Sequence, residues 1–166
     1  MKTLIVEDDL TSRIALQRLL SEYGDCDIAV DGQEALEAFA LAVKEQRAYD
    51  LICLDITMPC VDGHAALKGI RAQEKAQGIR PYNRAKIIMT TSRHDKPAVM
   101  RSIESECDAY IIKPVGRQRL LEKLCSIGLL EDRAWTLAIG LEEESEAQKA
   151  EDCGSGERNQ KEETGR

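Results

Sequence analysis

The sequence predicts an α/β protein built on a doubly wound parallel sheet. Short apolar runs alternate with stretches of helical periodicity through the first 130 residues, a pattern typical of consecutive βαβ units. A length of 166 residues favours one core with an extension over two cores. Acids, hydroxyl residues and a lysine follow the predicted strands, whereas the strands themselves are nearly uncharged.

The first two units are read from residues 3–46. The run at 3–6 predicts a strand, and apolar residues at helical spacing predict a helix over 11–23, which Gly24 ends. A short second strand is predicted at 27–30. The next helix, over 33–46, places alanines, Leu36 and Phe39 on one face.

The third and fourth strands are predicted at residues 51–54 and 86–90. Between them, a helix is expected over 65–77. The connector at 78–85 (GIRPYNRA) is polar and rich in turn residues, and it is longer than such units usually need.

The last unit of the domain closes near residue 130. A helix over 97–105 begins with a proline in its first turn, where the missing N–H group is not needed. A fifth strand follows at 109–112 and a final helix at 116–127. The elements together number five strands and five helices, within a domain over residues 1–130.

The chain changes character after this domain. Residues 131–150 are expected to form an extra C-terminal helix, and residues 151–166 an acidic tail without apolar residues to bury, for which disorder is the expectation. Residues 131–166 hold 11 acids and 5 bases, whereas residues 1–130 hold 19 acids and 18 bases. The net charge of −7 therefore belongs mainly to the extension.

Composition argues against several classes of protein. No apolar stretch approaches the roughly 20 residues that cross a membrane, and the start lacks the features of a signal peptide, so we expect a cytoplasmic protein without membrane insertion. The six cysteines show no zinc-ligand spacing and are expected to be free thiols. Nothing resembles a basic nucleic-acid face.

Polar side chains gather where the predicted strands end. Glu7 and Asp8 follow the first strand, Asp55 the third, a Thr-Thr-Ser run the fourth, and Lys113 the fifth. Ligands of doubly wound sheets bind at this edge. Converging carboxylates need a cation, and oxygen ligands favour Mg²⁺, while a lysine and a hydroxyl suit phosphoryl oxygens. The constellation predicts a phosphoryl-transfer site with an aspartate as nucleophile.

Single residues of this set have ordinary roles when each is taken alone. An acid after a strand most often forms a turn or caps a helix, and this remains the favoured interpretation for Asp9 and Asp62. The convergence of all these residue types on one edge is what favours a reactive site.

Four segments resemble the response-regulator receiver domain, the CheY-like family. They are LIVEDD at 4–9, LDITMPCVDG at 54–63, IIMTTS at 87–92 and YIIKP at 110–114, in the order and spacing of that family. The resemblance covers residues 1 to about 130. It implies a (βα)5 flavodoxin-like sandwich with strand order 2-1-3-4-5.

The resemblance also implies roles for individual residues. Asp55 would be the phosphoacceptor, and Mg²⁺ would be held by Glu7, Asp8, Asp55 and the backbone carbonyl of Thr57. Thr91 and Lys113 would contact the phosphoryl group. Tyr110 would be the aromatic switch residue that moves with Thr91, and the bond from Lys113 to Pro114 would be cis.

The expected function is a stand-alone switch of a two-component or phosphorelay system. A histidine kinase or histidine phosphotransfer protein would be the phosphodonor, and the surface around residues 97–127 would bind a downstream protein. The chain would be no enzyme on external substrates, only on its own phosphorylation and dephosphorylation, and either a monomer or a phosphorylation-dependent dimer.

Two other functions are also compatible with these residues. One is a pseudo-receiver that is never phosphorylated and acts as an interaction module, against which the intact acid, threonine and lysine set argues. The other is a phosphatase with an aspartyl intermediate, which usually carries its nucleophile on the first strand rather than the third.

Overall fold

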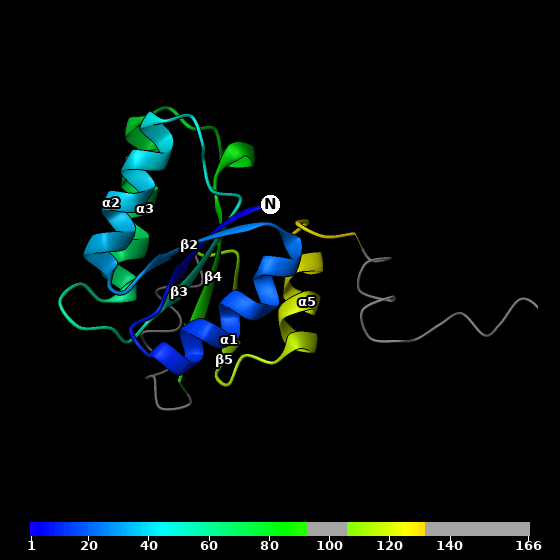
Figure 1. Ribbon diagram of the computed structural model, residues 1–166. Coiled ribbons are helices and arrows are strands. Elements are labelled where there is room, and N and C mark those ends of the chain that lie inside the picture. Colours follow the sequence, from blue (N-terminus) through cyan, green and yellow to red (C-terminus); the bar gives the residue numbers. More distant parts are fainter. Residues whose placement is uncertain (93–105, 132–166) are drawn as a thin grey trace, which may run out of the picture. The chain divides into compact units, whose positions relative to one another are not determined.

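The core of the protein is a five-stranded parallel sheet (Figure 1). The computed structural model describes residues 1–92 and 106–131, which lie within one compact unit, Met1–Glu131. The strand order β2-β1-β3-β4-β5 confirms the predicted doubly wound topology. The strands are β1 (Lys2–Val6), β2 (Asp25–Ala29), β3 (Leu51–Asp55), β4 (Lys86–Thr91) and β5 (Ala109–Ile112).

Helices cover both faces of this sheet. Figure 1 shows α2 and α3 on one face and α1 and α5 on the other. Each of α1, α2 and α3 begins after an aspartate whose side chain accepts a backbone hydrogen bond, the usual N-cap arrangement, which confirms the capping roles of Asp9 and Asp62. The helices are α1 (Leu10–Leu20), α2 (Gly32–Lys44), α3 (Gly63–Ala76) and α5 (Arg117–Ser126), with short 3₁₀ turns at Ser21–Tyr23 and Pro81–Asn83.

The central strand β3 is the most deeply buried element. All five of its residues are buried, because helices cover both faces and β1 and β4 flank it. Its register pairs Val6 with Leu54 on one side and Asp55 with Thr90 on the other. The carboxyl ends of β1, β3 and β4 therefore lie side by side.

Most predicted bounds differ from the observed ones by one or two residues. The predicted helix over 11–23 ends as an α-helix at Leu20 and continues as a 3₁₀ turn to Tyr23, before Gly24 with a φ of 145°. The second strand starts at Asp25 rather than residue 27, since Lys2 pairs with Asp25. The predicted helix at 97–105, the extra helix at 131–150 and the tail at 151–166 lie outside the described residues.

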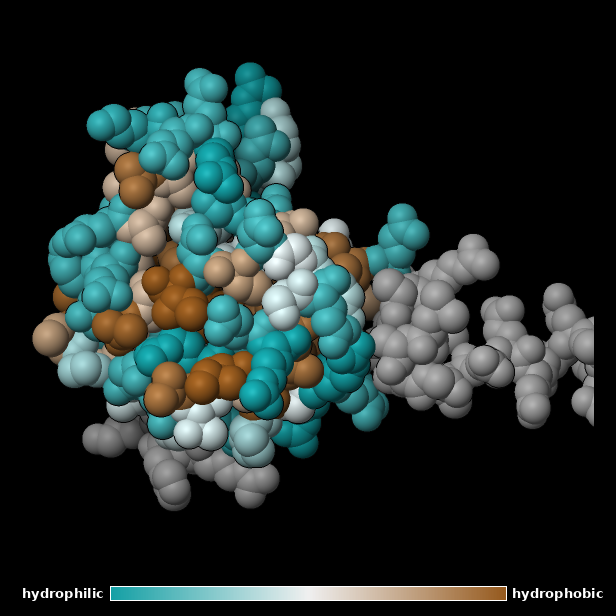
Figure 2. Space-filling model, in the orientation of Figure 1, coloured by the Kyte–Doolittle hydropathy of each residue, from teal (hydrophilic) through white to brown (hydrophobic). Residues whose placement is uncertain are grey.

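The exposed large hydrophobic residues of the described chain are Leu10, Ile14, Ile28, Val30, Leu41, Tyr82, Tyr110 and Ile112. The face drawn in Figure 2 is largely hydrophilic, with separate apolar patches. Within residues 1–92 and 106–131, no helix is long and apolar enough to cross a membrane.

Candidate functional site

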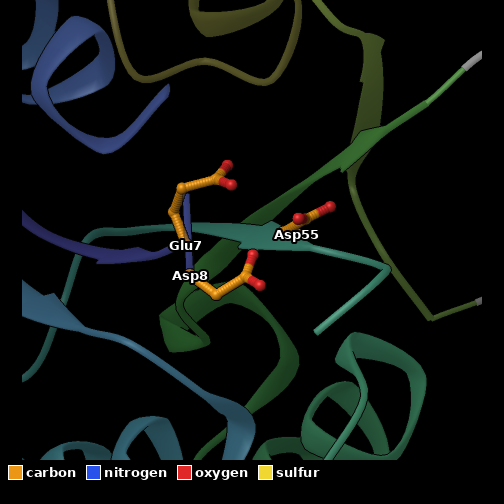
Figure 3. Close-up of side chains that lie close together, drawn as sticks. All are labelled: Glu7, Asp8 and Asp55. Carbon is orange, nitrogen blue, oxygen red and sulfur yellow. The ribbon is translucent and has the colours of Figure 1, made fainter. Parts of the chain in front are cut away.

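Three carboxylates converge where β1 and β3 end. Glu7 and Asp8 follow β1, Asp55 is the last residue of β3, and their side chains face one common region (Figure 3). One oxygen from each lies within 4.8 Å of the others. Glu7 and Asp55 are buried, whereas Asp8 is exposed, so the cluster opens to solvent on the Asp8 side.

Lys113 joins two of these carboxylates. It follows β5, and its Nζ donates to Glu7 Oε1 and to Asp55 Oδ2, each at 2.8 Å. Burial acts to lower the pKa of the Lys113 ammonium, but its hydrogen bonds to Asp55 and Glu7 outweigh that effect and leave the pKa raised. The side chain is therefore a fixed positive charge beside Asp55.

Glu7 has the most unusual environment of the three acids. Burial raises the pKa of its carboxyl, the Lys113 hydrogen bond opposes this, and the nearby Asp55 charge adds to the increase. Its second oxygen, Oε2, is buried and has no hydrogen-bond partner among the described residues. A buried oxygen in this condition is unfavourable unless a cation or a proton satisfies it. The donor set, all carboxylate oxygen and partly open, fits a hard divalent cation such as Mg²⁺.

Arg13 fixes the turn that presents Glu7 and Asp8. Its Nη1 donates to the Glu7 carbonyl oxygen at 2.8 Å and to the Asp8 carbonyl oxygen at 3.4 Å, from the first turn of α1. Arg13 carries no signal in the sequence pattern, because its contact with the two carbonyl groups depends on the shape of the turn.

The loop after Asp55 is held against the neighbouring strand ends. Ile56 N donates to the Thr90 carbonyl oxygen at 3.0 Å, and Thr57 N donates to Asp55 Oδ1 at 3.3 Å. A Cβ at Gly63 would lie 1.9 Å from the Asp55 carbonyl oxygen, so only glycine fits there. The start of α3 therefore packs directly on the backbone of the candidate nucleophile.

The other predicted site residues line the neighbouring strand ends. Thr91, the buried last residue of β4, donates its hydroxyl to the Ser92 carbonyl oxygen at 3.0 Å, and its carbonyl accepts from Lys113 N at 2.8 Å. The bond between Lys113 and Pro114 is cis. Tyr110 on β5 is 40% exposed, with the Lys123 ammonium 5.9 Å from its ring centroid.

The sequence that forms this site matches a family model. A model of the response regulator receiver domain matches residues 3–125. The chain belongs to the response regulator receiver family. A chemotaxis protein CheY homologue of Campylobacter jejuni is 32% identical to this receiver over 124 residues, which cover 75% of this chain and 89% of that protein.

Receivers inside larger proteins also match. The probable histidine kinase 2 of Oryza sativa is 30% identical over 132 residues, which cover 74% of this chain but only 12% of the kinase. This receiver thus spans about an eighth of the kinase's length.

Solved receiver structures share the fold. CheY of Borrelia burgdorferi, in a complex with CheX, BeF₃ and Mg²⁺, has a TM-score of 0.63 and 26% identity, covering 76% of this chain and 88% of that one. The receiver domain of a Pseudomonas aeruginosa sensor histidine kinase, with Mg²⁺ in its active-site cleft, has a TM-score of 0.61 and 26% identity, covering 76% of this chain and 97% of that one.

Proposed function

We propose that this receiver is a phosphorylation switch in which Asp55 accepts a phosphoryl group. The observation that carries the proposal is the contact of Lys113 Nζ with both Asp55 and the buried Glu7, beside the carboxylate of Asp8. A receiver that had lost phosphorylation would have no use for a buried acid and an ammonium held against a strand-end aspartate. The wider setting is a two-component or phosphorelay system.

The transfer step uses Asp55 as the nucleophile. One carboxylate oxygen attacks the phosphorus of the donor, a P–O bond to Asp55 forms, and the bond between phosphorus and the donor breaks with its electron pair leaving on the donor. No general base is needed because a carboxylate is itself a nucleophile. The Lys113 ammonium, 2.8 Å from Asp55, is placed to pair with a phosphoryl oxygen as the negative charge at Asp55 grows.

Mg²⁺ would be held by Glu7, Asp8, Asp55 and the Thr57 carbonyl. When bound, it supplies positive charge that offsets the repulsion between the carboxylates and the phosphoryl oxygens. The described residues contribute the rest: Arg13 orients the carbonyls of Glu7 and Asp8, and Gly63 allows α3 to approach Asp55.

The switch would run from Thr91 to the surface around residues 97–127. Thr91 and Lys113 are joined through their backbones, so a rearrangement of the Thr91 hydroxyl toward a phosphoryl group can reach β5 and Tyr110. Phosphorylation would bias an equilibrium between two arrangements of this surface, of which the structure describes residues 106–127. A downstream protein would distinguish the two.

The phosphodonor would be a histidine kinase or a histidine phosphotransfer protein. The receiver would turn over no external substrate and would catalyse only its own phosphorylation and dephosphorylation. The matches to CheY and to kinase-attached receivers support this class of partner without distinguishing a stand-alone receiver from one within a longer protein.

A direct test is phosphorylation by a small donor. The protein is incubated with acetyl phosphate and Mg²⁺ and examined by intact mass spectrometry, and we expect one phosphoryl adduct. Asp55→Asn should abolish it, whereas Asp62→Asn, an exposed acid that caps α3 in the same loop, should retain it.

Two results would overturn the switch. An unmodified protein under these conditions would favour a constitutive interaction module. Sustained release of phosphate from an external phosphate ester, abolished by Asp55→Asn, would favour a phosphatase.

A further inference from the structure

A second polar feature lies at the opposite edge of the sheet from Asp55. It is a groove of about 500 Å³ between the outer side of α3, the first residue of β4 and the segment that precedes β5. Lys86 opens β4, and Asp55 pairs with Thr90 near its other end, so the two sites are about 13 Å apart along the strand direction. We call this feature the α3 groove. The described residues that line it are Lys68, Arg71, Ala72, Lys75, Pro81, Arg84, Lys86, Glu106, Cys107 and Asp108.

The groove is positively charged, although the net charge of the domain is close to zero. Among the described residues that line it, five side chains are basic and two are acidic, whereas residues 1–130 as a whole hold 19 acids and 18 bases. Part of this charge is used internally. Arg71 donates to Glu74 Oε2 at 2.8 Å and to Asp108 Oδ2 at 3.1 Å, and Lys86 donates to Asp108 Oδ1 at 2.9 Å.

These internal pairs give the groove a rigid floor. Glu74 is completely buried, and its Oε1 accepts from Ala85 N at 3.0 Å, which ties α3 to the segment before β4. Arg71 also donates to the carbonyl oxygens of Glu106 and Ala85. The three walls of the groove are therefore fixed relative to one another before any partner arrives.

The two lysines on the rim of the groove have no ion-pair partner among the described residues. These lysines, Lys68 and Lys75, are exposed on α3. They are seven residues apart on one helix, two turns or about 10 Å along its axis. Arg84 adds a third cation with only a 3.7 Å contact to Glu74.

The long connector between α3 and β4 builds the outer wall. It supplies Pro81 and Arg84 to the lining, and it presents Tyr82 with 71% of its surface exposed. Arg80 donates to the Tyr82 hydroxyl at 2.8 Å and holds that side chain in place. Exposed tyrosine and arginine are the residue types that most often dominate protein interfaces.

We propose that the α3 groove docks an acidic helical segment of a partner protein. Carboxylates two turns apart on that helix would pair with Lys68 and Lys75, while Ala72, Pro81 and Cys107 would contact apolar residues between them. The uncharged residues Ala72, Pro81 and Cys107 in the lining favour a partner that carries apolar side chains between its negative charges, as a helix does and a run of phosphates does not. Because the groove lies away from Asp55, this contact would add to phosphorylation-dependent binding rather than replace it.

The test uses the full chain and a fluorescent helical peptide of alanine, leucine and glutamate, with glutamates seven residues apart on one face. Fluorescence anisotropy should detect binding that weakens as salt rises, with no binding by the same peptide carrying glutamine. The double variant Lys68→Glu/Lys75→Glu should lose about tenfold in affinity or more. A matched double variant, Arg18→Glu/Lys44→Glu, reverses two exposed charges in the last turns of α1 and α2 and should bind within about twofold of wild type.

Charge reversal in the probe completes the test. A peptide with lysine in place of glutamate should bind the Lys68→Glu/Lys75→Glu protein and not the wild type, and this result is independent of folding losses. The proposal is overturned if the wild type does not bind the acidic peptide at low salt, or if the two double variants weaken binding equally. Tighter binding of a single-stranded oligonucleotide than of the peptide would assign the groove to nucleic acid instead. Acetyl phosphate labelling of Asp55 should be the same in both double variants, so this proposal and the phosphorylation proposal fail separately.

Discussion

At the scale of single residues, Lys113 is central because it neutralises two acids at once. Its 2.8 Å contacts with Glu7 and Asp55 are the ion pairs that link the end of β5 to the ends of β1 and β3. Without the ammonium, the completely buried carboxyl of Glu7 would face Asp55 with no ion-pair partner among residues 1–92 and 106–131.

Lys113→Ala is therefore expected to destabilise the protein. Breaking a buried ion pair by removing one partner typically lowers the free energy of unfolding by about 3 kcal/mol or more. Added Mg²⁺ should recover part of this loss, because the same carboxylates are its ligands in our proposal. Urea unfolding of both proteins with and without Mg²⁺ measures this, and an Mg²⁺ effect no larger in the variant than in the wild type would contradict it.

Gly63 offers a sharper steric prediction. An alanine Cβ would lie 1.9 Å from the Asp55 carbonyl oxygen, so Gly63→Ala must displace α3 or the end of β3. We expect a loss of about 1–3 kcal/mol in unfolding free energy and a weaker acetyl phosphate reaction. Gly116→Ala is the matched control, since nothing lies within 4 Å of its added Cβ, and the loss of a favoured N-cap residue of α5 should cost less than about 1 kcal/mol.

At the scale of elements, the edge strand β2 is tied to the segment before β3 by one phenol. Tyr49 is buried, and its hydroxyl donates to Asp27 Oδ2 at 2.8 Å. Burial raises the pKa of Tyr49, and the hydrogen bond to Asp27 raises it further. Hydrogen bonds to a charged acceptor contribute about 1.5–3 kcal/mol, and the low end applies here because Asp27 is exposed.

This contact sets an alkaline limit on stability. A folded-state pKa above the unfolded value of about 10 means that the contribution is complete below pH ~10 and is lost as the pH rises from there through the folded pKa. Tyr49→Phe should lower the melting temperature at neutral pH, and the difference from wild type should shrink above pH ~10. Thermal unfolding monitored by circular dichroism across pH tests this, and a difference that stays constant to high pH would count against it.

A buried side chain also joins the helix α3 to the segment before β4. Glu74 is buried with Arg71 and the Ala85 amide as partners, so Glu74→Ala should cost about 3 kcal/mol of unfolding free energy. Glu37→Ala, on the exposed side of α2, should remain within about 0.5 kcal/mol of wild type. Denaturant titration of the two variants gives the comparison, and similar midpoints for both would show that the buried pair is not important for stability.

At the scale of the whole molecule, ligand binding at Asp55 should stabilise the folded state. A ligand that binds only the folded protein adds about 2.7 kcal/mol at a hundred times its dissociation constant. Beryllofluoride with Mg²⁺, a phosphoryl mimic, should therefore raise the melting temperature of the wild type and leave Asp55→Asn unchanged. An equal rise in both proteins would place the ligand elsewhere.

The parallel sheet and the residues brought together at its carboxyl edge were predictable from the residue pattern, whereas the strand order followed from the resemblance to receiver domains. Asp55, Glu7 and Lys113 lie at the ends of apolar runs. In a parallel sheet the carboxyl ends of the strands lie along the same edge, so these side chains are brought together there. The second strand was placed less well because β2 is an edge strand with mostly exposed residues, so its apolar pattern is weak.

Other features depend on geometry that a pattern does not encode. The contact of Arg13 with two backbone carbonyls needs the shape of one turn. Glu74 could have been found, since it follows Ile70 by four residues and so falls on the buried face of α3, where an acid requires a partner.

The arrangement of the sheet has a consequence for how the site opens. Asp55 ends β3, which is paired on both sides and wholly buried, whereas Lys113 follows β5, a four-residue strand at the edge of the sheet. Amide hydrogens of β3 should exchange with solvent only on global unfolding, and those of β5 through smaller local openings. The nucleophile and its ammonium would then belong to parts of the chain with different opening free energies, so that Lys113 can leave Asp55 while the rest of the sheet stays closed.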